Sequence, residues 1–379
     1  MKKELASIRD RLDLIDKTIV KALADRQDVV KEVASLKIDK AAGIRDLERE
    51  ELLLSKIRDF AHEVGLDRYY AEHLFREIIT NSVRFQTHSL VDHQNHKDGE
   101  ERVSVSYQGT DGAFSHLAAL RHFGERYSNV DCYGFDTFQQ AAQAVKDGQV
   151  NFAVLPIENT TAGSINDTYD ILGNSGLHIV GEEILKIVHC LMAVEPVDVS
   201  QIRRILSHPK AIEQCTNFLS KLPRCRVESY LDTAISAKKV LEDGDLSQAA
   251  IAGAHAADHY GLHIIAHNIA NQEENFTRFV IVSTEAVTID LQVPCKTSLM
   301  MVTSNEEGSL IDCLNVLHKH GINMSKLESR PLPHEPWRYS FYIDIEANTN
   351  NPKVEEALSE LANEAEELKI LGCYSKEMN

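Results

Sequence analysis

The chain has 379 residues, enough for two or three domains, and 43% of them are hydrophobic, so each domain can bury a core. Its formal net charge of −18 at pH 7 argues against a nucleic-acid partner, because such a partner requires a basic face. The seven cysteines are scattered, the N-terminal lysines precede no apolar run and no stretch is long enough to cross a membrane, which predicts a cytoplasmic protein without signal peptide, membrane contact or metal site.

The first predicted domain, residues 1–90, is all-α. Apolar residues in its first helix follow a heptad rhythm, which is typical of a long amphipathic helix that pairs with other helices. A polar stretch without periodicity begins at Thr87, and we place a linker at residues 91–101. The three helices are expected at about Leu5–Leu36, Asp46–His62 and Asp67–Gln86.

Polar residues interrupt the apolar stripes of these helices. Arg26 occupies a heptad position whose other members are apolar, and an unpaired charge there would be costly. The polar residues could form buried ion pairs, or the arginine could extend to solvent at a helix end. Alternatively they line a cationic pocket for a small dicarboxylate, where catalysis rests on positioning and electrostatics. These residues are Arg26, Lys37, Asp46, Arg49, Glu50, Ser82 and Gln86.

Together with Arg9, this set resembles the active site of the all-helical chorismate mutases. The resemblance implies that Arg26 and Arg9 hold substrate carboxylates, with Arg9 coming from the partner subunit of a homodimer or larger homo-oligomer. It implies that Lys37 and Gln86 face the ether oxygen that gains charge as chorismate rearranges to prephenate. A pericyclic rearrangement moves no proton, so a preorganised cationic cage is sufficient. The remaining members would surround the substrate ring: Asp46, Arg49, Glu50 and Ser82.

The second predicted domain, residues 102–285, is α/β. Short β-type runs alternate with helical ones, which predicts a mainly parallel sheet covered by helices. The chain is expected to cross between two lobes around Ile184 and Phe276.

A loop rich in hydroxyl and amide groups follows the apolar run Val150–Leu155. Ser164 is a candidate cap for the next helix, but one cap accounts for only one or two of these groups. The surplus predicts a loop that holds a polar ligand at a helix N-terminus, where backbone N–H groups favour anions.

Four motifs of the second domain resemble, in order, the signature of the prephenate dehydratases. With the first domain, they resemble the bacterial bifunctional chorismate mutase–prephenate dehydratases, which begin phenylalanine synthesis from chorismate. The resemblance implies a two-lobed domain like the periplasmic binding proteins, and no cofactor. The motifs are Gln108–Ala119, Pro156–Asp167, Ser207–Cys215 and Asn275–Phe279.

The same resemblance implies the dehydratase site. Thr277 is the leading catalytic candidate, with Glu158 and Gln214, and the general acid stays open. Arg278 is the cation for substrate, although it could instead pair within the protein. The other expected substrate contacts are Asn159, Thr160, Ser115, Ser207 and His208.

The third predicted domain, residues 296–379, has a βαββαβ order typical of the α+β ferredoxin-like fold. It resembles an ACT domain, the small-ligand sensor of amino-acid metabolism, which implies feedback inhibition by L-phenylalanine. Ser309 stands where the family usually has alanine, and the domain could instead serve only to dimerise the chain. The expected effector residues are Gly308, Ser309, Leu310, Glu328, Ser329, Arg330 and Pro331.

A small-molecule-binding protein without catalysis is the rival hypothesis, because two α/β lobes also build solute receptors. A regulator that binds DNA would require a basic helix-turn-helix module, and the first domain lacks that pattern.

Overall fold

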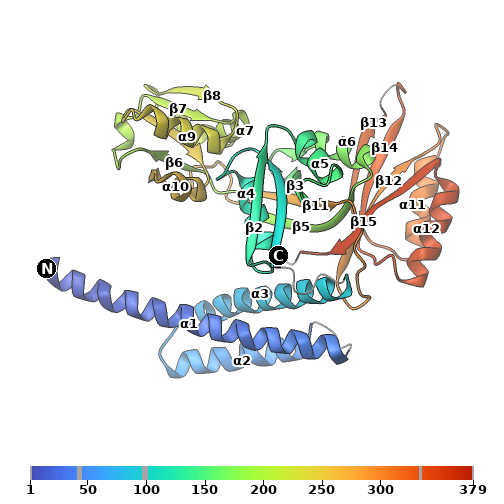
Figure 1. Ribbon diagram of the computed structural model, residues 1–379, viewed down its shortest axis with the longest axis horizontal. Helices are drawn as coiled ribbons and strands as arrows, with labels where there is room; N and C mark the ends of the chain where they lie inside the picture. The colour runs from blue at the N-terminus through green and yellow to red at the C-terminus, as the bar shows by residue number, and fades with distance from the viewer. Residues whose placement is uncertain (1, 41–44, 96–100, 333–334, 378–379) are drawn as a thin grey trace. The chain divides into compact units, whose positions relative to one another are not determined.

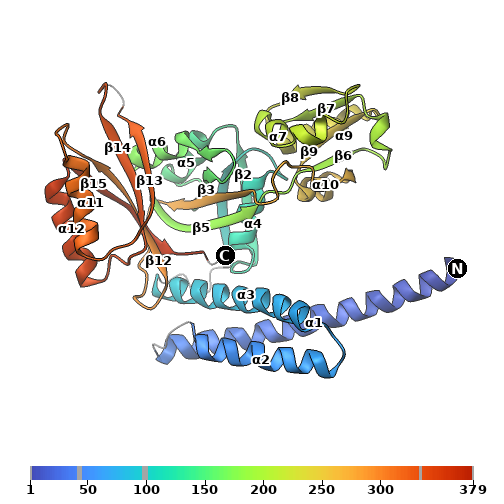
Figure 2. The same cartoon turned by 180° about the vertical axis from the view of Figure 1, so that it is seen from behind.

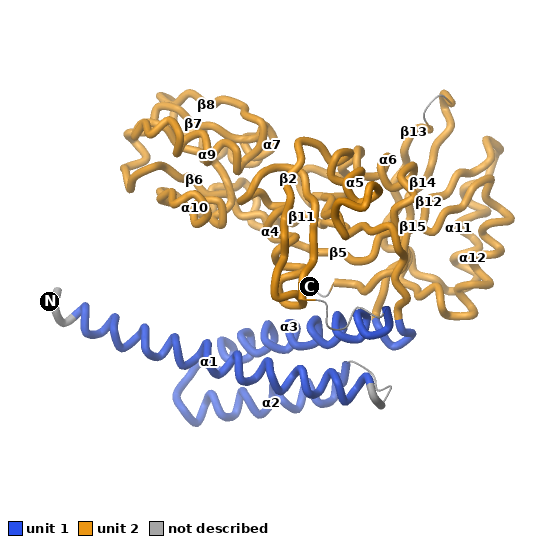
Figure 3. The backbone as a smooth tube through the Cα atoms, viewed as in Figure 1, with its two compact units in different colours: residues 1–98, 290–293, 378 blue, residues 99–289, 294–377, 379 orange. Residues whose placement is uncertain are grey.

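The computed structural model describes residues 2–40, 45–95, 101–332 and 335–377 (Figure 1). The chain divides into two compact units, which Figure 3 colours separately. The first comprises residues 1–98 and 290–293, and the second comprises residues 99–289 and 294–377.

In its described residues the first unit forms three helices, α1 (Lys2–Lys40), α2 (Leu47–Glu63) and α3 (Arg68–Gln94). Asp46 and Asp67 cap α2 and α3 by accepting backbone N–H bonds, as their positions before each apolar pattern favour. The three predicted helices are confirmed, but the linker prediction was wrong at its start. Polar residues after Gln86 continue α3, because Val91 and its neighbours still have a buried side to pack.

Most of the heptad stripe of α1 is exposed within one chain. Leu5, Ile8, Leu12, Ile15 and Ile19 are each about half exposed, from 47% to 53%. Such a row of apolar side chains is typical of a helix whose partner is another chain.

The second unit begins with a six-stranded mixed sheet of order β2-β1-β3-β11-β5, with β4 paired to β3. Helix α4 packs on one face, and α5 and α6 pack on the other. The predicted mainly parallel sheet was wrong here, because β11 returns from the second lobe and pairs antiparallel with both β3 and β5. The elements are β1 (Arg102–Gln108), α4 (Phe114–Phe123), β2 (Asn129–Phe135), α5 (Phe138–Lys146), β3 (Phe152–Asn159), β4 (Gly163–Ser164), α6 (Asn166–Ser175), β5 (His178–Lys186) and β11 (Phe276–Ser283).

A second sheet, of order β10-β6-β9-β7-β8, forms the other lobe. It is also mixed, since β6 pairs antiparallel with both β9 and β10. The chain enters this lobe after β5 and leaves it before β11, so the predicted crossings near Ile184 and Phe276 are confirmed (Figure 2). Its elements are β6 (Cys190–Ala193), η1 (Val199–Gln201), β7 (Arg204–Ser207), α7 (Pro209–Gln214), α8 (Thr216–Leu219), β8 (Arg226–Ser229), α9 (Thr233–Asp243), β9 (Gln248–Ala252), α10 (Ala254–Tyr260) and β10 (His263–Ala266).

The C-terminal segment has the predicted βαββαβ order and a four-stranded antiparallel sheet, β13-β14-β12-β15. Strand β12 is buried along its whole length. Leu299 and Met301 pack under α11 and α12, whereas Met300 points the other way, as strand alternation requires. The elements are β12 (Cys295–Val302), α11 (Ser309–Lys319), β13 (Met324–Pro331), β14 (Tyr339–Ile345), α12 (Pro352–Glu364) and β15 (Glu367–Ser375).

The first and third sheets share one hydrophobic core. Met300 and Tyr374 from the C-terminal sheet belong to the same buried cluster as Leu155 and Val280 from the first sheet. The hydroxyl of Tyr342 donates to the backbone carbonyl of Tyr169 at 2.8 Å. The C-terminal segment therefore covers one face of the first sheet and does not pack only against itself.

Among the described helices, none combines the length and the apolar character needed to span a membrane. All seven cysteines are free. The cytoplasmic location stays a prediction.

Candidate functional sites

In the helical unit, Arg26 meets Ser82 across two helices. The Arg26 guanidinium donates to Ser82 Oγ at 2.5 Å, and Ser82 Oγ donates to the Ile78 carbonyl at 2.7 Å. Burial lowers the pKa of Arg26. One turn later, Gln86 donates to the Ser82 carbonyl and leaves its buried Oε1 without a hydrogen-bond partner. These three predicted residues thus form a part-buried polar cluster between α1 and α3.

Lys37 lies near the start of α2. Burial lowers its pKa, while the charges of Asp46 and Glu50 act in the opposite direction. Glu50 accepts from the guanidinium of Arg45, and Asp46 uses a carboxylate oxygen to cap α2. The structure therefore groups the predicted cation with both predicted carboxylates.

Two predicted arginines, Arg9 and Arg49, have exposed side chains. Arg9 lies seventeen residues before Arg26 on the same helix, which is about 25 Å at the usual helical rise. Within one chain these two arginines cannot hold the same small molecule.

In the second unit, Asn159 ends strand β3 and forms the centre of a polar network. Its Oδ1 accepts the backbone N–H groups of Thr161 and Ala162 at 3.0 and 2.8 Å. Its Nδ2 donates to Thr277 Oγ1 at 2.9 Å and to Asn275 Oδ1 at 2.8 Å. The register explains this contact, because Asn159 pairs with Thr277 across neighbouring strands.

Gln214, at the end of α7 in the other lobe, completes the network. Its Nε2 donates to Thr161 Oγ1 at 2.6 Å, and its Oε1 accepts from Asn275 Nδ2 at 3.1 Å. The motifs around Asn159, Gln214 and Thr277 are therefore brought together from three distant segments.

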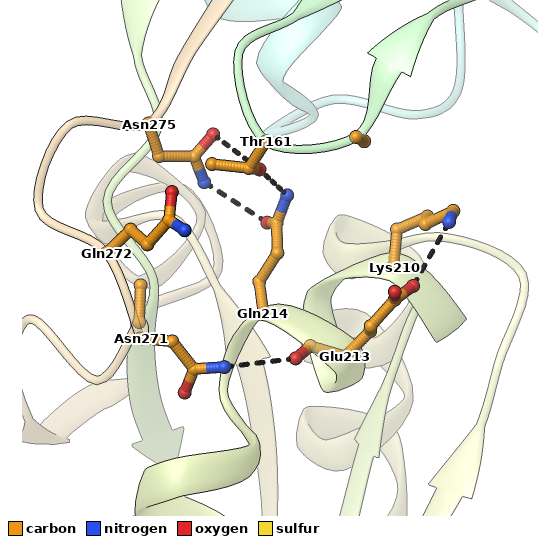
Figure 4. Close-up of a pocket in the computed structure, with 9 residues that line it drawn as sticks. Thr161, Lys210, Glu213, Gln214, Asn271, Gln272 and Asn275 are labelled. Carbon is orange, nitrogen blue, oxygen red and sulfur yellow. Dashed lines mark hydrogen bonds and ion pairs between the residues drawn. The ribbon is translucent and has the colours of Figure 1, made fainter.

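A cavity of about 140 Å³ lies beside this network (Figure 4). Thr161, Gln214 and Asn275 line it together with the Lys210–Glu213 ion pair, whose atoms are 3.0 Å apart. Amide, hydroxyl, ammonium and carboxylate groups thus surround it, a lining suited to a small polar ligand.

The other predicted polar residues hold local structure. Thr160 Oγ1 accepts the backbone N–H of Phe276, and Ser207, fully buried, donates to the Ile251 carbonyl. His208 caps α7 through its Nδ1, and burial lowers its pKa. Ser115 is buried in the first turn of α4.

Ser164 does not cap α6, so that prediction was wrong. The cap position is Ile165, which makes no side-chain cap bond, and Ser164 Oγ donates to Glu328 Oε2 at 2.5 Å. The Ser164 hydroxyl therefore bonds to strand β13 of the C-terminal sheet and not to the backbone of α6.

Arg278 and Glu158 lie away from the network, contrary to their predicted roles at substrate. Each is the strand neighbour of a network residue, so its side chain points to the opposite face of the sheet. Arg278 donates to Glu182 at 2.8 Å and to Asp344 at 2.6 Å, while Glu158 pairs with Lys326 at 2.8 Å. Both charges are compensated by the protein itself.

A buried charge cluster joins the first sheet to the C-terminal sheet around Arg278. Glu182 also accepts from Lys296 at 2.9 Å, and the Tyr374 hydroxyl accepts from Arg278 at 2.7 Å. Although burial opposes it, Tyr374, Asp344 and Glu182 raise the pKa of Arg278. Because Arg278 and Glu182 are fully paired within the protein, they hold the first sheet and the C-terminal sheet together and are not available to a ligand.

The predicted effector residues divide into two groups. Gly308 precedes α11 with φ of +88°, and Ser309 donates its hydroxyl to the Ser304 carbonyl at 2.7 Å, so this hydroxyl is used locally. Leu310 packs partly against the core under α11. On β13, Arg330 pairs with Asp170 at 2.8 Å and Glu328 holds Ser164, while Ser329 and Pro331 are exposed.

Three network residues escaped the sequence prediction: Thr161, Asn275 and His189. Thr161 and Asn275 lie inside quoted motifs and could have been included. His189 carries no local signal, because its partner Gln214 is 25 residues away and in another element.

Comparison with known proteins assigns the chain to a family. The family model of prephenate dehydratase matches residues 105–287, and that of type II chorismate mutase matches residues 8–87. The bifunctional chorismate mutase/prephenate dehydratase of Enterobacter agglomerans is 38% identical over 375 residues, 98% of this chain and 96% of that protein. The chain belongs to the bifunctional chorismate mutase/prephenate dehydratase family. It is therefore an enzyme of phenylalanine biosynthesis with both activities.

Solved structures resemble the dehydratase part of the bifunctional family. A prephenate dehydratase from Arthrobacter aurescens, in complex with L-Phe, has a TM-score of 0.65 and 28% identity, covering 73% of this chain and 90% of that one. GqqA, described as a novel type of quorum-quenching acylase, has a TM-score of 0.65 and 33% identity, covering 72% and 97%.

Proposed function

We propose that the two activities use two separate sites, the Arg26 cluster for chorismate and the Thr277 network for prephenate. The observation that carries the second assignment is the bond from Asn159 Nδ2 to Thr277 Oγ1, which joins two predicted residues beside a polar cavity. An assay of the purified chain with chorismate, which follows chorismate loss and phenylpyruvate appearance, tests the sequence of reactions.

At the mutase site, catalysis is electrostatic. Arg26 holds a carboxylate, while Lys37 and Gln86 face the ether oxygen that gains negative charge. Asp46 and Glu50 approach the ring hydroxyl, and the other members complete the pocket: Arg9, Arg49 and Ser82. The free Oε1 of Gln86 and the exposed stripe of α1 support a site that is finished by a second chain.

A complementation experiment tests the shared site. Arg9→Ala and Arg26→Ala variants should each lack mutase activity, but after the subunits exchange in a 1:1 mixture about a quarter of the activity should return. In a two-fold dimer a mixed pair holds one intact site and one doubly altered site. If no activity returned although labelled subunits had exchanged, the proposal that Arg9 and Arg26 of different chains form one site would be wrong.

At the dehydratase site, prephenate loses its ring carboxylate as carbon dioxide and its ring hydroxyl as water. The departing hydroxyl takes up one proton as it leaves. Thr277 donates a hydrogen bond to it, while Asn159 and Gln214 hold the pyruvyl end. Neutral donors bind the ground state less strongly than an arginine cage would, which leaves the carboxylate free to depart.

We further propose that residues 296–379 form an ACT domain that senses L-phenylalanine. The βαββαβ order and the positive φ of Gly308 before α11 support this, since glycine permits a close backbone approach and helix N–H groups suit a carboxylate. The exposed residues Ser329 and Pro331 on edge strand β13 would complete the effector site with a second domain.

Phenylalanine should inhibit prephenate dehydration roughly 5- to 150-fold and raise the melting temperature, because a typical coupling free energy is about 1–3 kcal/mol. Gly308→Ala should abolish this response. Gly321→Ala is the matched control, since Gly321 ends the same helix with φ of +66° and meets the same backbone strain away from the proposed effector site. If both variants lost the response to phenylalanine equally, backbone strain at the helix ends would explain the Gly308→Ala result, and an effector contact of Gly308 would not be needed.

A further inference from the structure

His189 lies where the chain passes from the first lobe into the second, just before β6. Its side chain is only 2% exposed, and its ring meets the edge of Phe114, whose centroid is 6.0 Å away. Its Nε2 lies 2.8 Å from Gln214 Oε1. This histidine therefore touches the outer end of the Thr277 network without lining the cavity.

The hydrogen-bond directions of the network can be read from the backbone outward. Asn159 Oδ1 accepts two backbone N–H groups, so the orientation of this amide is fixed and its Nδ2 must face Thr277 and Asn275. Asn275 then accepts through Oδ1 and donates through Nδ2 to Gln214 Oε1. Since Gln214 Oε1 is an acceptor, His189 Nε2 must carry a hydrogen.

The Nδ1 of His189 has no hydrogen-bond partner and is buried. Burial lowers the pKa of this imidazole, so near neutral pH the ring holds a single hydrogen, on Nε2. A single tautomer thus anchors one end of the network, and the backbone of Thr161 and Ala162 anchors the other.

The direction of the network has a consequence at Thr277. Its Oγ1 already accepts the Asn159 amide hydrogen. Among the described residues, the structure records no acceptor for the hydrogen of this hydroxyl. The hydroxyl is thereby left to donate, which is the direction that a departing hydroxide requires.

We propose that His189 is a positioning residue of the dehydratase: its Nε2–H fixes Gln214, and through Gln214 and Asn275 it keeps the amide chain that directs the Thr277 hydroxyl toward substrate. The inference rests on the proposed role of Thr277. The other side-chain partners of Gln214 all belong to the network on its far side, so the His189 ring is the support of Gln214 from within its own lobe.

A matched pair of variants tests the donor. His189→Gln retains an amide N–H at about the reach of Nε2, whereas His189→Asn is one methylene too short to meet Gln214. In the full-length chain, the asparagine variant should lose about 10- to 100-fold in dehydratase kcat, the scale typical of removing an outer hydrogen-bond partner. The glutamine variant should recover most of it, with mutase activity unchanged in both.

Two controls separate positioning from packing. His255→Asn alters a histidine that also meets the Phe114 edge but bonds instead to the backbone of Gly112 and Ala113, so its kcat should stay within about threefold of wild type. Adding His189→Asn to Thr277→Val should cost little more than Thr277→Val alone, because both changes act on one hydroxyl.

The outcomes distinguish the two hypotheses. If Thr277→Val retained wild-type turnover, the proposed dehydratase site would be wrong. Suppose instead that Thr277→Val is impaired. If His189→Asn then lowered dehydratase kcat by the same factor in the wild-type and in the Thr277→Val background, only the positioning role would be wrong. The same conclusion would follow if His189→Asn and His189→Gln had equal kcat. A comparable loss in His255→Asn would assign the effect to Phe114 packing and overturn the inference.

Discussion

Thr277→Val should lower dehydratase turnover at least about a hundredfold while mutase activity persists, the scale of losing one key polar catalytic contact. Valine keeps the branched shape that suits strand β11. It removes only the hydroxyl, and Asn159 Nδ2 still has acceptors in Asn275 Oδ1 and the Phe276 carbonyl. The cost should therefore appear in turnover and not in the melting temperature.

Thr277→Ser is the matched control, because it restores the hydroxyl on a smaller side chain. Prephenate consumption by the three full-length proteins, with mutase rates from the same preparations, measures the effect. If Thr277→Val kept wild-type dehydratase turnover, the Thr277 hydroxyl would have no role in the reaction.

Arg26→Ala should abolish chorismate rearrangement, by at least about a hundredfold, and leave prephenate dehydration intact. Arg26 is the part-buried cation that donates to Ser82. When the guanidinium is removed, Ser82 still keeps its hydrogen bond to the Ile78 carbonyl. The loss should thus fall on substrate binding and charge stabilisation, and not on the fold of the helical unit.

Arg11→Ala provides the control for Arg26, since Arg11 is an exposed arginine of the same helix. Circular dichroism and both activities should be measured for each variant. A fall of both activities in Arg26→Ala with an intact fold would contradict the two-site proposal.

The sequence was most informative where local rules act. Asp46 and Asp67 mark helix starts, and three of the four dehydratase motifs converge on one network. It failed where the partner is distant: Arg278 is a plausible substrate cation until β14 brings Asp344 to it. Strand alternation alone could have separated Thr277 from Arg278, because neighbours on a strand face opposite sides.

The mixed character of the two dehydratase sheets was equally out of reach. Local runs predict strands, but the direction in which β11 returns depends on how the second lobe closes. His189 was missed for the same reason, since its role exists only after α7 folds against the crossing segment.

The charge cluster around Glu182 ties the C-terminal sheet to the first sheet, and it limits how the protein can be divided. A chain cut after Val293 would lose Lys296 and Asp344 and would leave the Arg278–Glu182 pair on a newly exposed face. The cut would also remove the C-terminal half of the shared apolar core, so it should cost a large part of the stability of this unit. The two sheets should therefore melt in one cooperative transition, and evolution could exchange the C-terminal segment for another only by rebuilding the surface beneath it.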